Sequence, residues 1–189
     1  IALVSWAAGA AYMRTAEAAN ITTVSDLLST SATSTPSNHT ITFTTPNGVA
    51  AGETIVITFP VGDFDFTDAS LLSFDLATTS DIALAETPSG ATWGVATSTA
   101  PDTVTFTSGT GVIPANATVT IEIGTNATFG GNGLGQVINP DAGNYDVDIT
   151  AGTSDSGSTV LVILDQVYVT ASVDTVFTFS VGALGGGQT

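Results

Sequence analysis

Residues 37–60 read SNHTITFTTPNGVAAGETIVITFP, and this stretch decides the fold class. In its first half, Ile41 and Phe43 alternate with threonines; in its second half, residues 54–59 alternate in the same way. A period of two is typical of a strand with one buried face. The cluster Pro46-Asn47-Gly48 between the halves is typical of a turn. Two half-buried strands are therefore predicted here.

The rest of the chain repeats this pattern. Further strand-like runs lie at residues 72–76, 82–86, 91–96, 103–107, 118–123, 145–150, 160–164, 167–173 and 176–181. Short strands recurring between Gly- and Pro-containing turns indicate an antiparallel sandwich. The predicted fold is mainly β, an Ig-like β-sandwich domain at residues 20–189. The Gly-rich stretch 129–143 is expected to be a loop; loops of this length are often functional, but we favour the alternative that it simply caps the sandwich.

Charge excludes two classes of partner. The chain of 189 residues carries 17 acidic residues and one cation, Arg14, for a net charge of −16. Such a charge opposes binding to nucleic acid and to anionic lipid headgroups. Since charged residues make up only 10% of the chain, its surface must be rich in hydroxyl and amide groups, which suits an extracellular protein.

The residue inventory also argues against catalysis. The chain has no Cys and no Lys, and His39 is its single histidine. Nucleophilic sites of the Ser/His/Asp or Cys/His type need a base beside the nucleophile, and only His39 is available. We expect His39 to be a surface strand residue, the protein not to be an enzyme, and no cofactor to be bound.

One acidic group could bind a hard cation. Asp63, Asp65 and Asp68 lie within VGDFDFTD, where alternate carboxylates could serve as Ca²⁺ ligands. The alternative is a solvated turn whose phenylalanines point inward. The spacing departs from that of an EF-hand loop, so the second interpretation is favoured.

Four sequons are candidate glycosylation sites. Their asparagines are Asn20, Asn38, Asn116 and Asn126.

Residues 1–19 differ from the rest of the chain. They are apolar and rich in Ala, the strongest helix former, so we expect an N-terminal hydrophobic α-helix. The run also looks like the core of a secretory signal peptide, with an A-x-A pattern at Ala16-Glu17-Ala18. We expect the helix to be retained and buried among copies of itself, as an assembly helix. Its expected contact residues are Ile1, Leu3, Val4, Trp6, Ala7, Gly9, Ala11, Tyr12, Met13 and Arg14.

An apolar N-terminal helix leading into a β-sandwich resembles the layout of type IV pilins and, more closely, archaeal-type adhesion pilins. Bacterial type IV pilins usually carry Glu at the fifth mature position, where this chain has Ser5. Residues 37–60 and 169–181 also resemble Ig-like surface proteins of uncultivated, small-genome bacteria. These resemblances imply a place on the cell envelope.

The sequence thus predicts a structural subunit of an extracellular, pilus-like filament on the cell surface. Its partners would be copies of itself and, before assembly, the membrane. One alternative is an adhesion or binding module anchored by its N-terminus, with a surface or glycan target. Another is a filament built by donor-strand exchange, since Phe177, Phe179 and Val181 form an apolar face. We expect that last strand to complete its own sheet.

Overall fold

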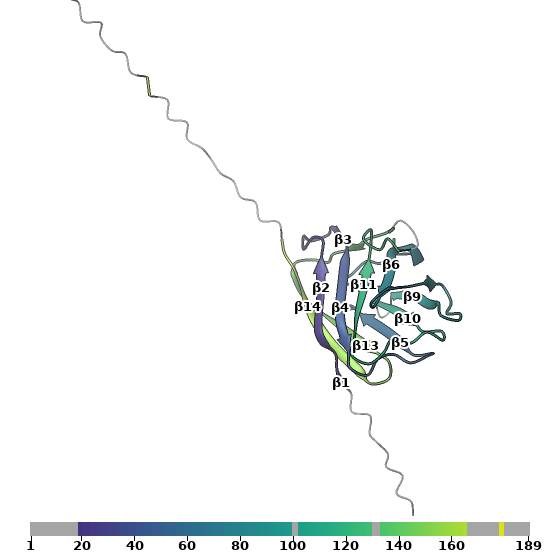
Figure 1. Ribbon diagram of the computed structural model, residues 1–189. Helices are drawn as coiled ribbons and strands as arrows, with labels where there is room; N and C mark the ends of the chain where they lie inside the picture. Colours follow the sequence, from purple (N-terminus) through teal and green to yellow (C-terminus); the bar gives the residue numbers. More distant parts are fainter. Residues whose placement is uncertain (1–18, 100–101, 130–132, 166–177, 180–189) are drawn as a thin grey trace, which may run out of the picture.

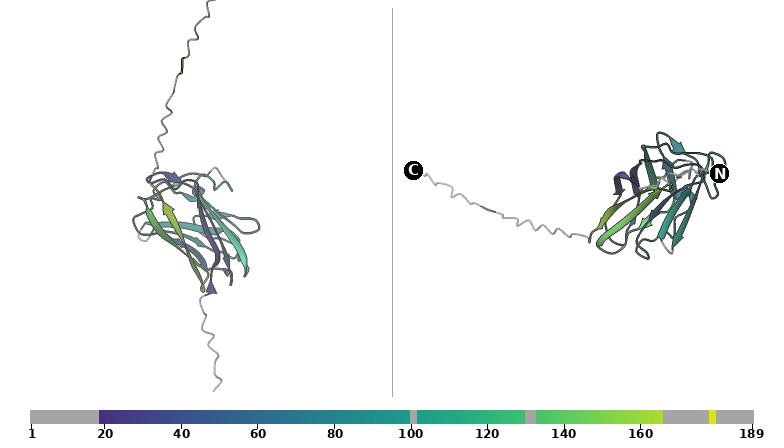
Figure 2. Two further views of the ribbon diagram at one scale, coloured as in Figure 1. Left: turned by 90° about the vertical axis from the view of Figure 1, so that its left-hand side faces the viewer. Right: turned by 90° about the horizontal axis from the view of Figure 1, so that it is seen from below.

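The computed structural model describes residues 19–99, 102–129, 133–165 and 178–179. Two β-sheets pack face to face, with strand order β1-β14-β13-β5-β10-β9-β8 in one and β2-β4-β11-β6-β7 in the other (Figures 1 and 2). The strands of the first sheet are β1 (Ala19–Asn20), β5 (Thr54–Thr58), β8 (Leu84–Ala85), β9 (Trp93–Thr99), β10 (Asp102–Thr107), β13 (Gly143–Ala151) and β14 (Asp155–Ile163). Those of the second are β2 (Thr22–Leu28), β4 (His39–Thr45), β6 (Phe74–Ala77), β7 (Asp81–Ile82) and β11 (Ala117–Ile123). A small ribbon pairs β3 (Pro36–Ser37) with β12 (Val137–Ile138).

The predicted alternation places the core between the sheets. In β4 every second residue is buried, and β5, β10 and β11 follow the same rule. The largest fully buried side chains include Trp93, Phe43 and Phe106. The sandwich predicted from the sequence is therefore confirmed.

The helical part of the predicted fold class is wrong. The described residues contain no α-helix, only a 3-10 turn at Leu71–Ser73. Ala19, the last residue of the predicted helix, lies in β1 and pairs in parallel with Asp155 of β14. Pairing with a neighbouring strand therefore overrides the helix propensity of alanine at this position. Residues 1–18, with all ten predicted contact residues, lie outside the described part, and no described helix could span a membrane.

The chain crosses from one sheet to the other at Ile21, between β1 and β2. This crossing brings Ile21 against Gly157 of β14, where an added Cβ would lie 2.9 Å from Cβ of Ile21. Position 157 thus requires glycine, because Ile21 lies too close to leave room for a side chain. The crossing leaves β2 and β14 side by side at one open side of the sandwich (Figure 1).

Residues 133–143, the described part of the Gly-rich stretch beyond Phe129, cover one end of the sandwich, as expected. Val137 is fully buried, and Ile138 forms a bridge with Asp65. Asn139 donates from Nδ2 to the carbonyl oxygens of Thr30 and Ala32, both at 2.9 Å. The stretch therefore fastens loops from both sheets.

Candidate functional site

The outer face of β14 carries an exposed apolar stripe. Val160, Val162 and Leu164 are 56%, 47% and 54% exposed, although Leu161 and Ile163 between them are buried. One edge of β14 pairs with β13 along its whole length. Among the described residues, the strand that pairs with the other edge is β1, at Asp155 and Ser156 alone. The stripe therefore borders a sheet edge on the open side of the sandwich.

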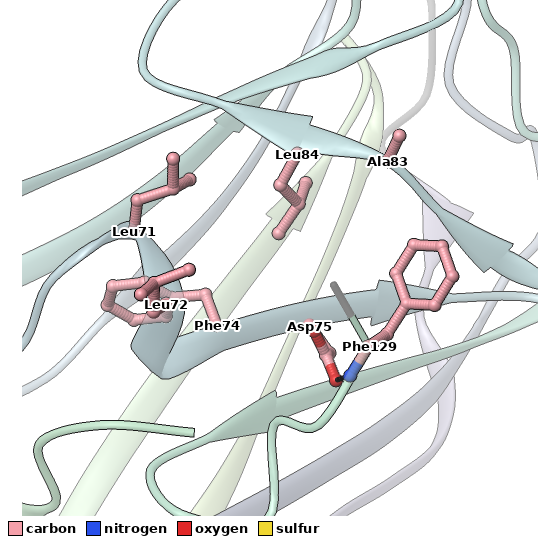
Figure 3. A pocket seen from close by; sticks show the side chains of 7 residues that line it. All are labelled: Leu71, Leu72, Phe74, Asp75, Ala83, Leu84 and Phe129. Atoms are coloured by element: carbon pink, nitrogen blue, oxygen red, sulfur yellow. Dashed lines mark hydrogen bonds between the residues drawn. The ribbon is translucent and has the colours of Figure 1, made fainter. Parts of the chain in front are cut away.

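A pocket of about 230 Å³ lies where β6 meets the turn before it, the β8 region and the loop after β11 (Figure 3). Its lining is apolar except for one carboxylate; the residues are Leu71, Leu72, Phe74, Asp75, Ala83, Leu84 and Phe129. Leu72 and Phe129 are each 45% exposed, so apolar surface continues to the rim.

Asp75 is the polar group of this pocket and is only 6% exposed. Its Oδ2 accepts a hydrogen bond from the backbone N–H of Phe129 at 2.6 Å. Burial raises the pKa of Asp75, helped by the charge of Asp81, although hydrogen bonds from Phe129 and Thr128 oppose the shift. The net direction shows that the carboxylate lacks full compensation for its charge.

Two further acids surround Asp75. Glu122 lies directly opposite it in register, on β11, and Asp81 lies on β7. Burial raises the pKa of Glu122, and the charges of Asp75 and Asp81 add to the effect. A cation placed here would relieve the repulsion, while the apolar walls would accept a hydrocarbon group.

His39 is not on the surface, contrary to expectation. Its side chain and that of Asp26 are both fully buried, and His39 Nδ1 lies 2.8 Å from Asp26 Oδ2. The ring packs edge-on against Phe59 and Phe64, with centroids 5.6 and 6.1 Å away. Within the described part of the chain, His39 Nε2 and Asp26 Oδ1 have no hydrogen-bond partner. A base enclosed in the core cannot reach a substrate, so this pair belongs to the packing of the core.

The three aspartates proposed for Ca²⁺ do not assemble a site. Asp65 Oδ1 accepts bonds from the hydroxyl of Thr67 and from its N–H at 2.8 Å. Both bonds lower the pKa of Asp65, and the bond from the hydroxyl has the larger effect. Among the described residues, which include Asp63 and Asp68, no three acidic or histidine side chains could hold a metal.

The four sequon asparagines differ in what their side chains do. The Nδ2 of Asn38 donates to Thr125 Oγ1 at 3.0 Å, and that of Asn126 donates to the carbonyl oxygen of His39 at 3.0 Å. Asn20 and Asn116 are exposed. Since the glycan is attached to this nitrogen, Asn20 and Asn116 are the accessible candidates.

The apolar C-terminal face is described at one residue only. Phe179 is 80% exposed, so it does not pack into the sandwich as expected of a strand completing its own sheet. Phe177 and Val181 lie outside the described residues.

Comparison with known proteins identifies no family. No family model and no curated protein matches the chain. One similar solved structure is that of BslA, a bacterial hydrophobin, with 12% identity over 78% of this chain and 98% of that chain and a TM-score of 0.48. Another is that of an uncharacterized protein from Nocardia farcinica with an immunoglobulin-like fold. Its identity is 14% over 79% of this chain and 89% of that chain, with a TM-score of 0.29.

Proposed function

We propose that this protein is a secreted, non-catalytic structural subunit of a cell-surface filament, assembled from copies of itself. The observation that carries the proposal is the exposed apolar stripe of Val160, Val162 and Leu164, beside a sheet edge that no described strand covers along residues 157–163. With a net charge of −16, copies repel one another. Apolar and backbone contacts must therefore drive their association, and β14 offers both.

Export is supported by the position of the first strand, which begins directly after a possible signal-peptide cleavage site. The A-x-A pattern ends at Ala18, and β1 begins at Ala19. Cleavage after Ala18 would remove the apolar run and leave the first strand intact. This interpretation replaces the retained assembly helix.

The absence of catalysis is supported by the position of His39. It is the chain's single histidine, and it is enclosed with Asp26 between aromatic rings. The chain has no Cys or Lys that could replace it as a nucleophile or base.

The test is expression of the full chain in a bacterial host that exports it, followed by analysis of the extracellular protein. We expect N-terminal sequencing to begin at Ala19, and sedimentation and electron microscopy to show filaments. Assembly should increase with ionic strength, because salt screens the repulsion between acidic copies. Monomeric extracellular protein at every salt concentration would refute the filament, and extracellular protein that still carries residues 1–18 would refute the cleavage.

A surface binding module is the second candidate, and the pocket around Asp75 favours it. The pocket is smaller than the roughly 300–1,000 Å³ of drug-sized sites, so it suits one small group. Its apolar walls and three nearby carboxylates match a hydrocarbon group that carries an ammonium ion. This chemistry differs from that of a glycan.

We expect phenethylammonium to bind this pocket and to shift the NMR signal of the Phe129 amide. Its neutral isostere, 2-phenylethanol, should bind at least about tenfold more weakly, since one lost charge contact corresponds to about 1.4 kcal/mol or more. Asp75→Asn should remove the difference between the two probes, and the matched control Asp146→Asn on β13 should not. Equal binding of both probes to the unaltered protein would contradict the role of Asp75.

A further inference from the structure

The unpaired edge of β14 can be located residue by residue. The N–H of Ile21 donates to the carbonyl oxygen of Ser156 at 2.8 Å, and the N–H of Leu164 donates to Ser31 at 2.8 Å. Both bonds lie on the edge of β14 that faces away from β13. Backbone groups of a strand point to alternate edges, so the even-numbered residues between these anchors point the same way.

Ser158, Val160 and Val162 therefore present their N–H and C=O groups at this edge. Along residues 157–163, the described part of the chain provides no strand that pairs with it. The open stretch is roughly 23 Å long, at about 3.3 Å per residue. An edge of this length is a template for an added strand.

Apolar side chains lie on both sides of the edge. Val160 and Val162 are exposed on the outer face. On the inner side, Val24 and Leu28 of β2 pack against the core but are only partly buried. An added strand would find apolar surface whichever way its apolar face pointed.

The chain contains a segment with the matching pattern. Between residues 167 and 181, valine, alanine or phenylalanine occupies every odd position except Thr175, and mostly polar residues occupy the even ones. The segment is longer than the open stretch. Phe179, its described apolar residue, is 80% exposed and so remains available to a partner.

The segment cannot easily pair with the edge of its own β14. It begins just after Leu164, and the edge at Leu164 is already occupied by Ser31 and by a bridge to Ala32. A hairpin turning back there would have to displace both. A part of the segment from another molecule, as long as residues 157–163, can pair between the two anchors and leave both in place.

We infer that residues 167–181 of one copy add as a strand to the residue 157–163 edge of β14 in the next copy. This inference rests on the proposed filament and names its joint. The donor segment and the acceptor edge are different surfaces, so every copy can give one strand and accept another. Such head-to-tail contacts extend into an open filament unless the rotation closes a ring.

The test compares edge and segment variants of the full chain by sedimentation and electron microscopy. Val160→Pro should reduce assembly at least about tenfold, because proline removes an outward N–H and places its ring at the edge. Its thermal unfolding should remain cooperative and close to wild type, since that N–H has no partner among the described residues. Thr159→Pro, whose N–H faces β13, should instead unfold the domain.

Phe179→Asp should also reduce assembly at least about tenfold, because it places a charge on the apolar face of the segment. It cannot unfold the sandwich, since Phe179 lies outside the core. Thr178→Asp adds the same charge to the opposite face and is the matched control, expected to assemble almost normally.

A synthetic peptide of residues 167–181 should shorten the filaments by capping open edges. If wild type forms filaments and both Val160→Pro and Phe179→Asp do so equally well, strand addition is refuted while the filament stands. If wild type forms none, the proposed function itself is refuted.

Discussion

His39→Ala is expected to lower the free energy of unfolding by about 3–5 kcal/mol, because removing one partner of a buried pair leaves the other uncompensated. The side chains of His39 and Asp26 are both fully buried and meet at 2.8 Å. Removing the imidazole leaves the Asp26 carboxylate in the core without its donor. It also leaves a cavity beside Phe59 and Phe64. Urea unfolding followed by tryptophan fluorescence measures the loss.

A double variant shows whether the destabilisation comes from breaking the His39–Asp26 pair or from losing the two side chains themselves. Asp26→Leu together with His39→Phe should unfold within about 1 kcal/mol of wild type or above it, because apolar replacements of a buried pair are often neutral or stabilising. The unpartnered His39 Nε2 and Asp26 Oδ1 favour this outcome. If the double variant instead lost the sum of the two single losses, the two side chains would not act as a pair.

Asp155→Asn is expected to lower the free energy of unfolding by roughly 3 kcal/mol at neutral pH, through hydrogen bonds to a charged group. Asp155 is 2% exposed and joins the start of β14 to the turn after β4. Its carboxylate accepts bonds from the Thr45 hydroxyl, from the Asn47 N–H at 2.9 Å and from Asn47 Nδ2 at 2.6 Å. In the Asn variant an NH₂ group replaces one carboxylate oxygen. A donor would then face the donors of Thr45 and Asn47.

The same network predicts a pH dependence. Burial acts to raise the pKa of Asp155, but hydrogen bonds from Thr45, Asn47 and Ser154 outweigh it and hold the pKa below its usual value. A folded-state pKa below the unfolded value adds stability above the unfolded value, and this stability is lost as pH falls through the folded value. Wild type should therefore lose stability in acid more steeply than Asp155→Asn does, as urea unfolding at a series of acidic pH values would show. Parallel curves for the two proteins would contradict this contribution.

The pH dependence of stability expected from Asp75 has the opposite sign, so Asp75 serves as a control. Because its pKa is raised, the folded state gains stability as pH falls from above the folded value to below the unfolded one. Asp75→Asn should remove that gain, so its stability should fall more steeply in acid than that of wild type.

The strands of the core were predictable because their alternation is complete. His39 follows the same rule: it has the parity of Ile41 and Phe43, and all three side chains point into the core. That parity could have placed His39 inside. Its polarity led to the wrong expectation, because the partner that permits its burial, Asp26, lies 13 residues away on another strand.

Strand β2 was missed for the same reason. Its inward positions are Val24, Asp26 and Leu28, and a carboxylate in the middle breaks the apolar pattern. The pocket was missed as well, because Asp75 and Phe129 are 54 residues apart in the chain. The Gly-rich composition after Phe129 indicated irregular structure, but nothing in the sequence indicated that Phe129 contacts Asp75.

By itself, the sequence determined the mainly β class, the core faces of the regular strands, the acidic charge and the poverty of catalytic groups. These depend on local periodicity and on composition. Tertiary structure alone decided that Ala19 starts a strand, that His39 pairs with Asp26, and that no described strand covers the edge of β14 along residues 157–163. Each of these depends on which distant segment lies alongside, and pairing between sheets and strands is a property of the whole chain.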